Sequence, residues 1–434
     1  MFVTRTCQIR VRAGKFTRMH ILLGCVALIQ TAMFRGDLAH TAVYRDTGIA
    51  RLAGVKWRFH TGGRVIASPA IEGQTVYVGS TDGKLYAVDL GHGNLRWKFS
   101  SGARITSSPA IADGVVYVVS YDGNLYAVDA TTGQQRWKFA TEGERRFEGT
   151  HLHGIMPVAE RQPDPFDVFL SSPAVYDGAV YFGSGDGHVY AVDTSGKLRW
   201  KYQAGDVIYA SPAIADGIVY IGSWDSYFYA LDAATGALKW RFKTGEDPDI
   251  HNQVGIQSSA AVADGVVYFG CRDSQFYALD AKTGEKKWSF DNHGSWVVSS
   301  PAVRDGVVYF GTSDSKRIWA LDAKAGTPIL ELPTRLGMFG SPAIAGHWLY
   351  IGSWDGTLTA VDLNTKKPGW IFQTDASRTN LQTILKKNDM EPFYDAMVAL
   401  VEQKFVVGPI LSSPVIADHT LYVGAGDGDL YALY

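Results

Sequence analysis

Cysteine is scarce in this chain of 434 residues. Only three cysteines are present, and Cys7 and Cys25 fall within the first 35 residues, which leaves Cys271 for the rest of the chain. A disulfide framework and a Cys-x-x-Cys metal site are therefore excluded there. Cys271 stands where related stretches have serine, so we expect a small strand residue, with a reactive thiol as the alternative. The corresponding serines are Ser80, Ser120, Ser184, Ser223 and Ser353.

An excess of one charge is also lacking. The chain has 41 Lys and Arg against 43 Asp and Glu, a net charge of -2. Such a balance creates no field that would draw nucleic acid or acidic lipid to the whole molecule, so no nucleic-acid partner is expected. Signatures of catalysis are missing too: no Ser/His/Asp order, no paired carboxylates and no glycine-rich phosphate loop stand out. We assign no catalytic residue.

The one notable apolar run extends from Ile21 to Met33 and follows a segment rich in arginine. A basic segment followed by about a dozen apolar residues is typical of a secretory signal and is too short for a stable membrane span. We therefore predict a leader over residues 1–35, a periplasmic or secreted mature protein, and no transmembrane domain in it. Lipidation at Cys25 is less favoured, because few apolar residues precede Cys25 and the run continues beyond it.

Residues 107–139, SSPAIADGVVYVVSYDGNLYAVDATTGQQRWKF, contain four short β-prone segments. Two of them, 115–119 and 125–128, flank Asp122-Gly123, and Asp-Gly supplies the positive φ angles that a tight hairpin needs. A third segment, 108–111, comes before this hairpin, and a fourth, 135–139, follows it. The stretch predicts a four-stranded antiparallel meander.

This unit recurs along nearly the whole chain. Repeats of about forty residues with four strands each are typical of a β-propeller, since one small sheet cannot bury both of its faces alone. We predict an all-β, eight-bladed propeller over residues 36–434 as a single domain. The last copy ends before its fourth strand, so we expect residues 55–59 to complete that blade and close the ring. The copies begin at Ser68, Ser107, Ser171, Ser211, Ser258, Ser299, Ser341 and Ser412.

Three insertions interrupt the repeat, at 140–170, 243–257 and 373–411. The first is rich in charge, histidine and proline, and loops of this length are usually functional or disordered. The third has apolar residues at helical spacing, which predicts two short amphipathic helices. In an antiparallel blade, links between blades lie on the same rim as the hairpin between the second and third strands. All three insertions should therefore share one face, the candidate functional surface.

The residue before each hairpin aspartate varies between copies, and the turn does not dictate it. Four copies place an aromatic ring or a guanidinium there, at Tyr121, Trp224, Arg272 and Trp354. Such side chains are enriched in recognition surfaces, so these four are candidate binding residues. Packing between blades is the alternative. The hairpin aspartates themselves are explained by turn formation, and eight carboxylates spread around a rim do not converge on one cation.

The insertions supply further candidates. His151 and His153 alternate in the first insertion, and His251 and Asn252 are adjacent in the second. Both pairs could contact a ligand, while anchoring of their own loops is the alternative. Alternating histidines with no fixed third ligand are a weak metal signal, so no metal site is assigned.

The stretch from Ala127 to Trp137, Ala-x-Asp-x-x-Thr-Gly-x-x-x-Trp, resembles the tryptophan-docking motif of the pyrroloquinoline quinone (PQQ) repeat family. The motif recurs at 230–240 and 278–288, and the resemblance extends from Trp57 to Tyr434. Met33-Phe34-Arg35-Gly36-Asp37 also resembles the start of the mature chain in bacterial PQQ-like propellers. The family includes quinoprotein alcohol dehydrogenases and the outer-membrane β-barrel assembly lipoprotein, so the resemblance implies a fold and leaves the function open.

Two functional hypotheses follow. In the first, the chain is an extracytoplasmic, non-catalytic monomer that binds a protein, peptide or small ligand on the insertion face. In the second, which the resemblance alone implies, it is a PQQ-dependent dehydrogenase that uses calcium. Many such dehydrogenases have an adjacent-cysteine disulfide over the cofactor, and this chain has no such pair. Whether the protein is an enzyme stays open, with the non-catalytic hypothesis favoured.

Overall fold

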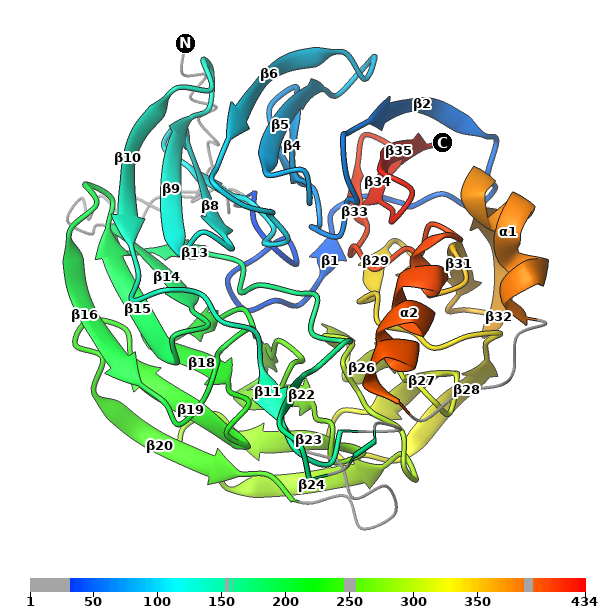
Figure 1. The fold of residues 1–434 in the computed structure, drawn as a ribbon. Helices are drawn as coiled ribbons and strands as arrows, with labels where there is room; N and C mark the ends of the chain where they lie inside the picture. Colours follow the sequence, from blue (N-terminus) through cyan, green and yellow to red (C-terminus); the bar gives the residue numbers. More distant parts are fainter. Residues whose placement is uncertain (1–31, 153–155, 158, 246–254, 386–392) are drawn as a thin grey trace, which may run out of the picture. The chain divides into compact units, whose positions relative to one another are not determined.

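Eight small antiparallel sheets are arranged around one axis as the blades of a propeller (Figure 1). This computed structural model describes residues 32–152, 156–157, 159–245, 255–385 and 393–434. Seven blades have four strands from consecutive sequence, and the eighth combines strands from both ends of the chain. The predicted all-β, eight-bladed architecture is confirmed.

The strands lie in four concentric layers. The innermost strands are β3 (Ala70–Glu72), β7 (Ala110–Ala112), β13 (Ala174–Tyr176), β17 (Ala213–Ala215), β21 (Ala261–Ala263), β25 (Ala302–Arg304), β29 (Ala343–Ala345) and β33 (Val415–Ala417). The second layer contains β4 (Thr75–Gly79), β8 (Val115–Ser120), β14 (Ala179–Gly183), β18 (Ile218–Gly222), β22 (Val266–Gly270), β26 (Val307–Gly311), β30 (Trp348–Gly352) and β34 (Thr420–Gly424).

The third and fourth layers lie farther from the axis, and the third is covered by the fourth. The third contains β5 (Lys84–Asp89), β9 (Asn124–Asp129), β15 (His188–Asp193), β19 (Tyr227–Asp232), β23 (Gln275–Asp280), β27 (Arg317–Asp322), β31 (Thr357–Asp362) and β35 (Asp429–Leu433). The outermost strands are β2 (Val55–His60), β6 (Leu95–Ser100), β10 (Gln135–Ala140), β16 (Leu198–Gln203), β20 (Leu238–Lys243), β24 (Lys286–Asp291), β28 (Pro328–Pro333) and β32 (Lys367–Gln373).

In six of the blades, the tryptophan of the outer strand joins the blade to the next one. The indole N–H of Trp97 donates to the carbonyl of Ala130 in the following blade at 2.9 Å. Gly133 lies against the same ring, and a Cβ there would come within 2.7 Å of Trp97 Cδ2. The glycine of the docking motif is therefore required by close approach as well as by its φ of +73°.

The chain closes its ring in blade eight. β2 pairs antiparallel with β35, with Arg58 opposite Tyr431 and His60 opposite Asp429. Trp57 is buried there, and its indole donates to the carbonyl of Leu90 at 3.0 Å. The prediction that residues 55–59 complete the last blade is confirmed, and the closure removes the long exposed edges of an open sheet.

Five of the eight hairpin aspartates accept a backbone N–H from the link that arrives from the preceding blade. One carboxylate oxygen of Asp122 accepts the backbone N–H of Asn124 at 3.1 Å, and the other accepts the Tyr126 hydroxyl at 2.7 Å and the N–H of Gly102 at 2.6 Å. Gly102 belongs to the link from blade one. The links and the hairpins therefore lie on one rim, as predicted, and we call it the insertion face.

Two insertions form secondary structure on the insertion face. The first contains a small hairpin of β11 (Glu148–Gly149) and β12 (Gln162–Pro163). The third contains α1 (Asp375–Leu385) and α2 (Tyr394–Phe405), so both predicted helices are confirmed. Most of the second insertion, residues 246–254, lies outside the described part of the chain. Among the helices that the structure describes, none has the length and apolar character required to span a bilayer.

The segment 32–44 runs across the inner strands of the propeller. Its carbonyls accept backbone N–H groups from five blades, at Ile111, Ile214, Val262, Val303 and Ile344. It ends in β1 (Val43–Tyr44), which adds in parallel to β29. The guanidinium of Arg35, only 1% exposed, donates to the carbonyls of Pro301 and Pro342 at 2.6 Å each. Residues 32–35, expected in the leader, thus lie in this segment, while residues 1–31 fall outside the described part.

Candidate functional site

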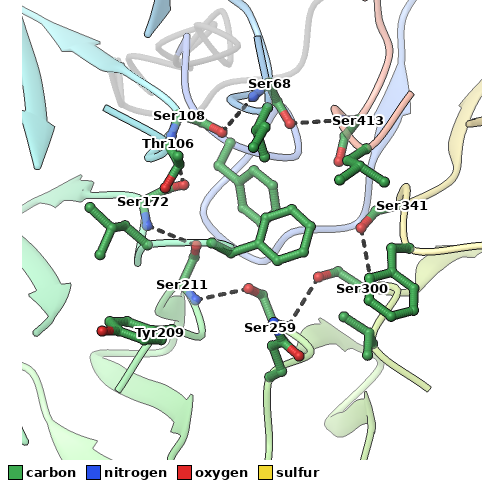
Figure 2. Close-up of a pocket in the computed structure, with 18 residues that line it drawn as sticks. Ser68, Thr106, Ser108, Ser172, Tyr209, Ser211, Ser259, Ser300, Ser341 and Ser413 are labelled. Atoms are coloured by element: carbon green, nitrogen blue, oxygen red, sulfur yellow. Dashed lines mark hydrogen bonds between the residues drawn. The ribbon is translucent and has the colours of Figure 1, made fainter. Parts of the chain in front are cut away.

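A ring of serine side chains surrounds the axis of the propeller (Figure 2). The backbone N–H of one serine donates to the hydroxyl of the serine in the next blade, as from Ser108 to Ser172 at 2.9 Å. The bond from Ser413 to Ser68 at 2.8 Å links blade eight to blade one. Each of these serines precedes a proline or an alanine at the start of an inner strand. The same residue type recurs because the backbone N–H of each serine needs an acceptor. The ring consists of Ser68, Ser108, Ser172, Ser211, Ser259, Ser300, Ser341 and Ser413.

Little space remains inside the ring. The axial cavity has a volume of about 40 Å³. Phe34 of the N-terminal segment and Phe169 and Leu170 of the first insertion line it together with the serines. The axis is therefore closed by side chains from two distant parts of the sequence.

The residues before the hairpin aspartates pack against the insertions. Trp224 is 1% exposed and stacks on Phe147, with ring centroids 4.1 Å apart. The hydroxyl of Tyr121 donates to the carbonyl of Phe169 at 3.4 Å, and the Arg104 guanidinium lies 3.9 Å from its ring centroid. Trp354 is 4% exposed and makes edge contacts with Phe339 and Phe405.

Arg272 is as fully enclosed as Trp224, with 1% of its surface exposed. Its guanidinium lies between two indole rings, 4.3 Å from the centroid of Trp224 and 4.0 Å from that of Trp296. It forms an ion pair with Asp164, and a second nitrogen donates to the amide oxygen of Gln257 at 3.1 Å. Both charged side chains are almost completely buried. Arg272 therefore fixes the first insertion to blade five.

Two further carboxyl groups of the first insertion are buried. Glu144 accepts the hydroxyl of Ser184 at 2.9 Å and the N–H of Gly185 at 2.7 Å, and burial raises its pKa to about 8. Asp167 accepts the N–H of Phe147 at 2.9 Å, and burial raises its pKa to about 7. Desolvation favours the neutral acid in both cases. These hydrogen bonds hold the insertion in place.

An open depression lies between the two helices and the rim of blades six and seven, with a volume of about 540 Å³. We call it the helix groove. One wall comes from α1 and α2, the other from the blade hairpins and links, and Phe166 of the first insertion contributes as well. Its lining residues are Phe166, Trp296, Ser313, Asp314, Lys316, Leu336, Gly337, Phe339, Trp354, Ile384, Leu385, Leu400 and Lys404.

Helix α2 presents two different faces. Met397, Val401 and Phe405 are buried against the propeller, whereas Leu400 and Lys404, one turn apart, line the helix groove. The Lys404 ammonium lies 5.4 Å from the ring centroid of Phe166 and 5.9 Å from that of Trp354, within the range of a cation–π contact. Burial lowers its pKa from the ordinary value. The Lys404 ammonium therefore lies among apolar and aromatic side chains.

Comparison with known proteins identifies the family. The family model described as outer membrane protein assembly factor BamB matches residues 45–162 and 148–372, which together cover more than half of the chain. The chain belongs to the BamB family. No curated protein matches it.

Solved structures support the fold. BamB from Moraxella catarrhalis superposes with a TM-score of 0.63 at 17% identity, covering 88% of this chain and 97% of that one. Quinohemoprotein alcohol dehydrogenase from Comamonas testosteroni gives a TM-score of 0.70 at 16% identity, covering 93% and 80%. The computationally designed Ika8 protein gives 0.63 at 17% identity, covering 90% and 100%. Likeness at this level of identity establishes the shared fold alone.

The quinone of the dehydrogenases does not fit the axis of this BamB-family chain. Ligand pockets have volumes of about 300–1,000 Å³, whereas the axial cavity is about 40 Å³ and is closed by Phe34 and Phe169. Within the described ranges, no group of three or more His, Cys, Asp or Glu side chains is arranged so that it could hold a metal ion. The helix groove, by contrast, has a volume within the ligand range.

The predicted binding residues have different locations in this family member. Trp354 lines the helix groove, while Tyr121, Trp224 and Arg272 contact the first insertion or its neighbours. His151 is exposed, with a φ of +57°, and His153, His251 and Asn252 lie outside the described residues. The sequence reasoning missed Lys404 and Trp296. Lys404 follows Leu400 by four residues, so the helical spacing already noticed there would have placed the two on one face.

Proposed function

We propose that this protein is a non-catalytic, extracytoplasmic propeller that binds a segment of a partner protein in the helix groove. The contrast between the axial cavity and the helix groove carries the proposal: the axis is closed to about 40 Å³, whereas the groove keeps about 540 Å³. The groove is lined by the aromatic side chains of Phe166, Trp296 and Trp354, which are typical of binding sites.

The way in which the groove is built supports a binding role. Asn380 of α1 donates to the carbonyl of Val406 at the end of α2 at 3.0 Å, so the two helices form one wall. Val401 and Phe405 belong to a buried cluster with Trp296 and Trp354, which anchors that wall to the opposite side. A groove that is already formed loses less conformational entropy when a partner binds. Membership of a family described as an assembly factor agrees with a protein partner.

Site-specific photo-crosslinking tests this function. A photoreactive phenylalanine analogue placed at Leu400 or Ile384 should yield a discrete adduct with a partner protein in intact cells. The same analogue at Leu238, which is 42% exposed on the outer strand β20, is the matched control and should yield none. Equal labelling at all three positions, or none at the two groove positions, would argue against a partner in the groove.

A further inference from the structure

The charges of the helix groove are unevenly matched. Its lining contains two cations, Lys316 and Lys404, and one carboxylate, Asp314. Asp314 accepts the hydroxyl of its neighbour Ser313 at 2.6 Å. Within the described residues, Lys404 forms no salt bridge. The groove therefore offers a net positive charge of one, with an ammonium group available to an incoming anion.

The surroundings of Lys404 define what can accompany that anion. Phe166, Trp354 and Leu400 lie on the same lining, so the space next to the ammonium favours apolar groups. Since Lys404 already occupies the position over the two aromatic rings, a cationic ligand would meet like charge there. Burial of the Lys404 ammonium lowers its pKa, and the nearby Asp314 offsets only part of this effect. A carboxylate on the ligand would relieve the remaining penalty through a charge-assisted hydrogen bond.

We infer that Lys404 is the anion anchor of the helix groove, and that the segment received there presents a carboxylate next to a bulky apolar group. This inference rests on the proposed function, because it concerns the same groove, and it adds the chemistry that selects the partner. The carboxylate would pair with the Lys404 ammonium while the apolar group packs on Trp354, Phe339 and Leu400. Asp314, on the rim side, would disfavour a second carboxylate there.

Two isosteric probes test the charge preference on the intact chain. We expect 1-naphthoate to bind more tightly than 1-naphthamide by about tenfold, which corresponds to the modest free energy of one ion pair. Isothermal titration calorimetry or ligand-observed NMR gives both affinities on the wild-type protein, so this arm does not depend on any variant folding. Equal binding of the two probes, or binding of neither, would overturn the inference.

Variants then assign the preference to one residue. Lys404→Met should reduce the naphthoate preference to within about twofold, whereas Lys404→Arg should keep it, because the charge is retained. Lys316→Met, which removes the other cation of the groove, is the matched control and should keep most of the preference. If Lys404→Met retains the preference, Lys404 is not the anchor.

The two proposals fail in different ways. If crosslinks form at Leu400 but naphthoate and naphthamide bind equally, the inference on Lys404 is contradicted and the proposed binding function is supported. If the naphthoate preference depends on Lys404 but no crosslinks form at Leu400 or Ile384, the anion site stands and the proposal of a protein partner in the groove is contradicted.

Discussion

The Glu144 carboxylate, in the first insertion, accepts the backbone N–H of Gly185, the residue before the hairpin aspartate of blade three, at 2.7 Å. A Cβ on Gly185 would meet this carboxylate and would lie 2.6 Å from the carbonyl oxygen of Arg145. The insertion passes directly over this blade, and only the absence of a side chain lets it do so.

Gly185→Ala should therefore displace the start of the first insertion. Overpacking of this kind costs about 1–3 kcal/mol, and we expect a lower apparent melting temperature in differential scanning calorimetry. Gly91→Ala is the matched control, since a Cβ there would have an ordinary contact at 3.4 Å with Asp89. Equal melting temperatures for the two variants would contradict the proposed close approach.

Glu144 should make stability depend on pH. Its folded-state pKa, raised to about 8 by burial, exceeds the ordinary value of 4.5. Between these two pKa values the folded state holds a proton that the unfolded chain has released, so the free energy of unfolding falls as pH rises. Glu144→Gln should remove the contribution of Glu144, reducing the change in unfolding free energy between pH 5 and pH 8 by about 1–3 kcal/mol, while the contribution of Asp167, whose pKa is also raised, remains. Urea titrations at both pH values measure the free energy of unfolding.

Glu331→Gln, at an exposed position on β28, is the control and should leave the pH dependence of stability unchanged. An unchanged pH dependence in Glu144→Gln would refute the prediction.

Arg272→Met should strongly destabilise the insertion face. Removing the guanidinium leaves Asp164 as a buried carboxylate without its partner, which costs about 3–5 kcal/mol. The double variant Arg272→Met with Asp164→Asn should recover part of this loss, because the unpaired charge is removed. Chemical denaturation followed by tryptophan fluorescence measures these free energies of unfolding. Arg317→Met, which breaks an exposed pair with Glu331, should cost less than about 1 kcal/mol.

PQQ with calcium should not bind along the axis. The serine ring encloses about 40 Å³ between Phe34 and Phe169, far below the volume of a ligand pocket. Adding both to the purified protein should change neither the absorption spectrum of the quinone nor the melting temperature. Saturable binding would revive the dehydrogenase hypothesis, and competition by 1-naphthoate would then show whether the quinone occupies the helix groove.

The fold could be predicted because its determinants repeat locally. The copies contain their own turn residues, and six of the eight contain a docking tryptophan, so weak signals reinforce one another along the chain. The closure of the ring by β2 could be predicted because the last copy of the repeat ends before its fourth strand. The indole bonds, such as Trp97 to Ala130, explain the spacing of the docking motif.

The candidate site could be predicted only in part. The insertion face was located correctly, because strand order decides which rim holds the links. The partners of the variable positions were not predictable, since Arg272 and Asp164 are 108 residues apart in sequence. Lys404 was overlooked because a lysine on an amphipathic helix normally faces water, and only the docking of α2 turns it toward Phe166.

The seam in blade eight also decides how the ring responds to tension. Val55 pairs with Leu433 while His60 pairs with Asp429, so both chain ends leave this ladder at the same end. A pull on the two termini would first strip the N-terminal segment from the inner strands. It would then unzip β2 from β35 one hydrogen bond at a time, instead of shearing all the bonds together. The ring is continuous in its packing, yet the ladder between β2 and β35 would be loaded from one end.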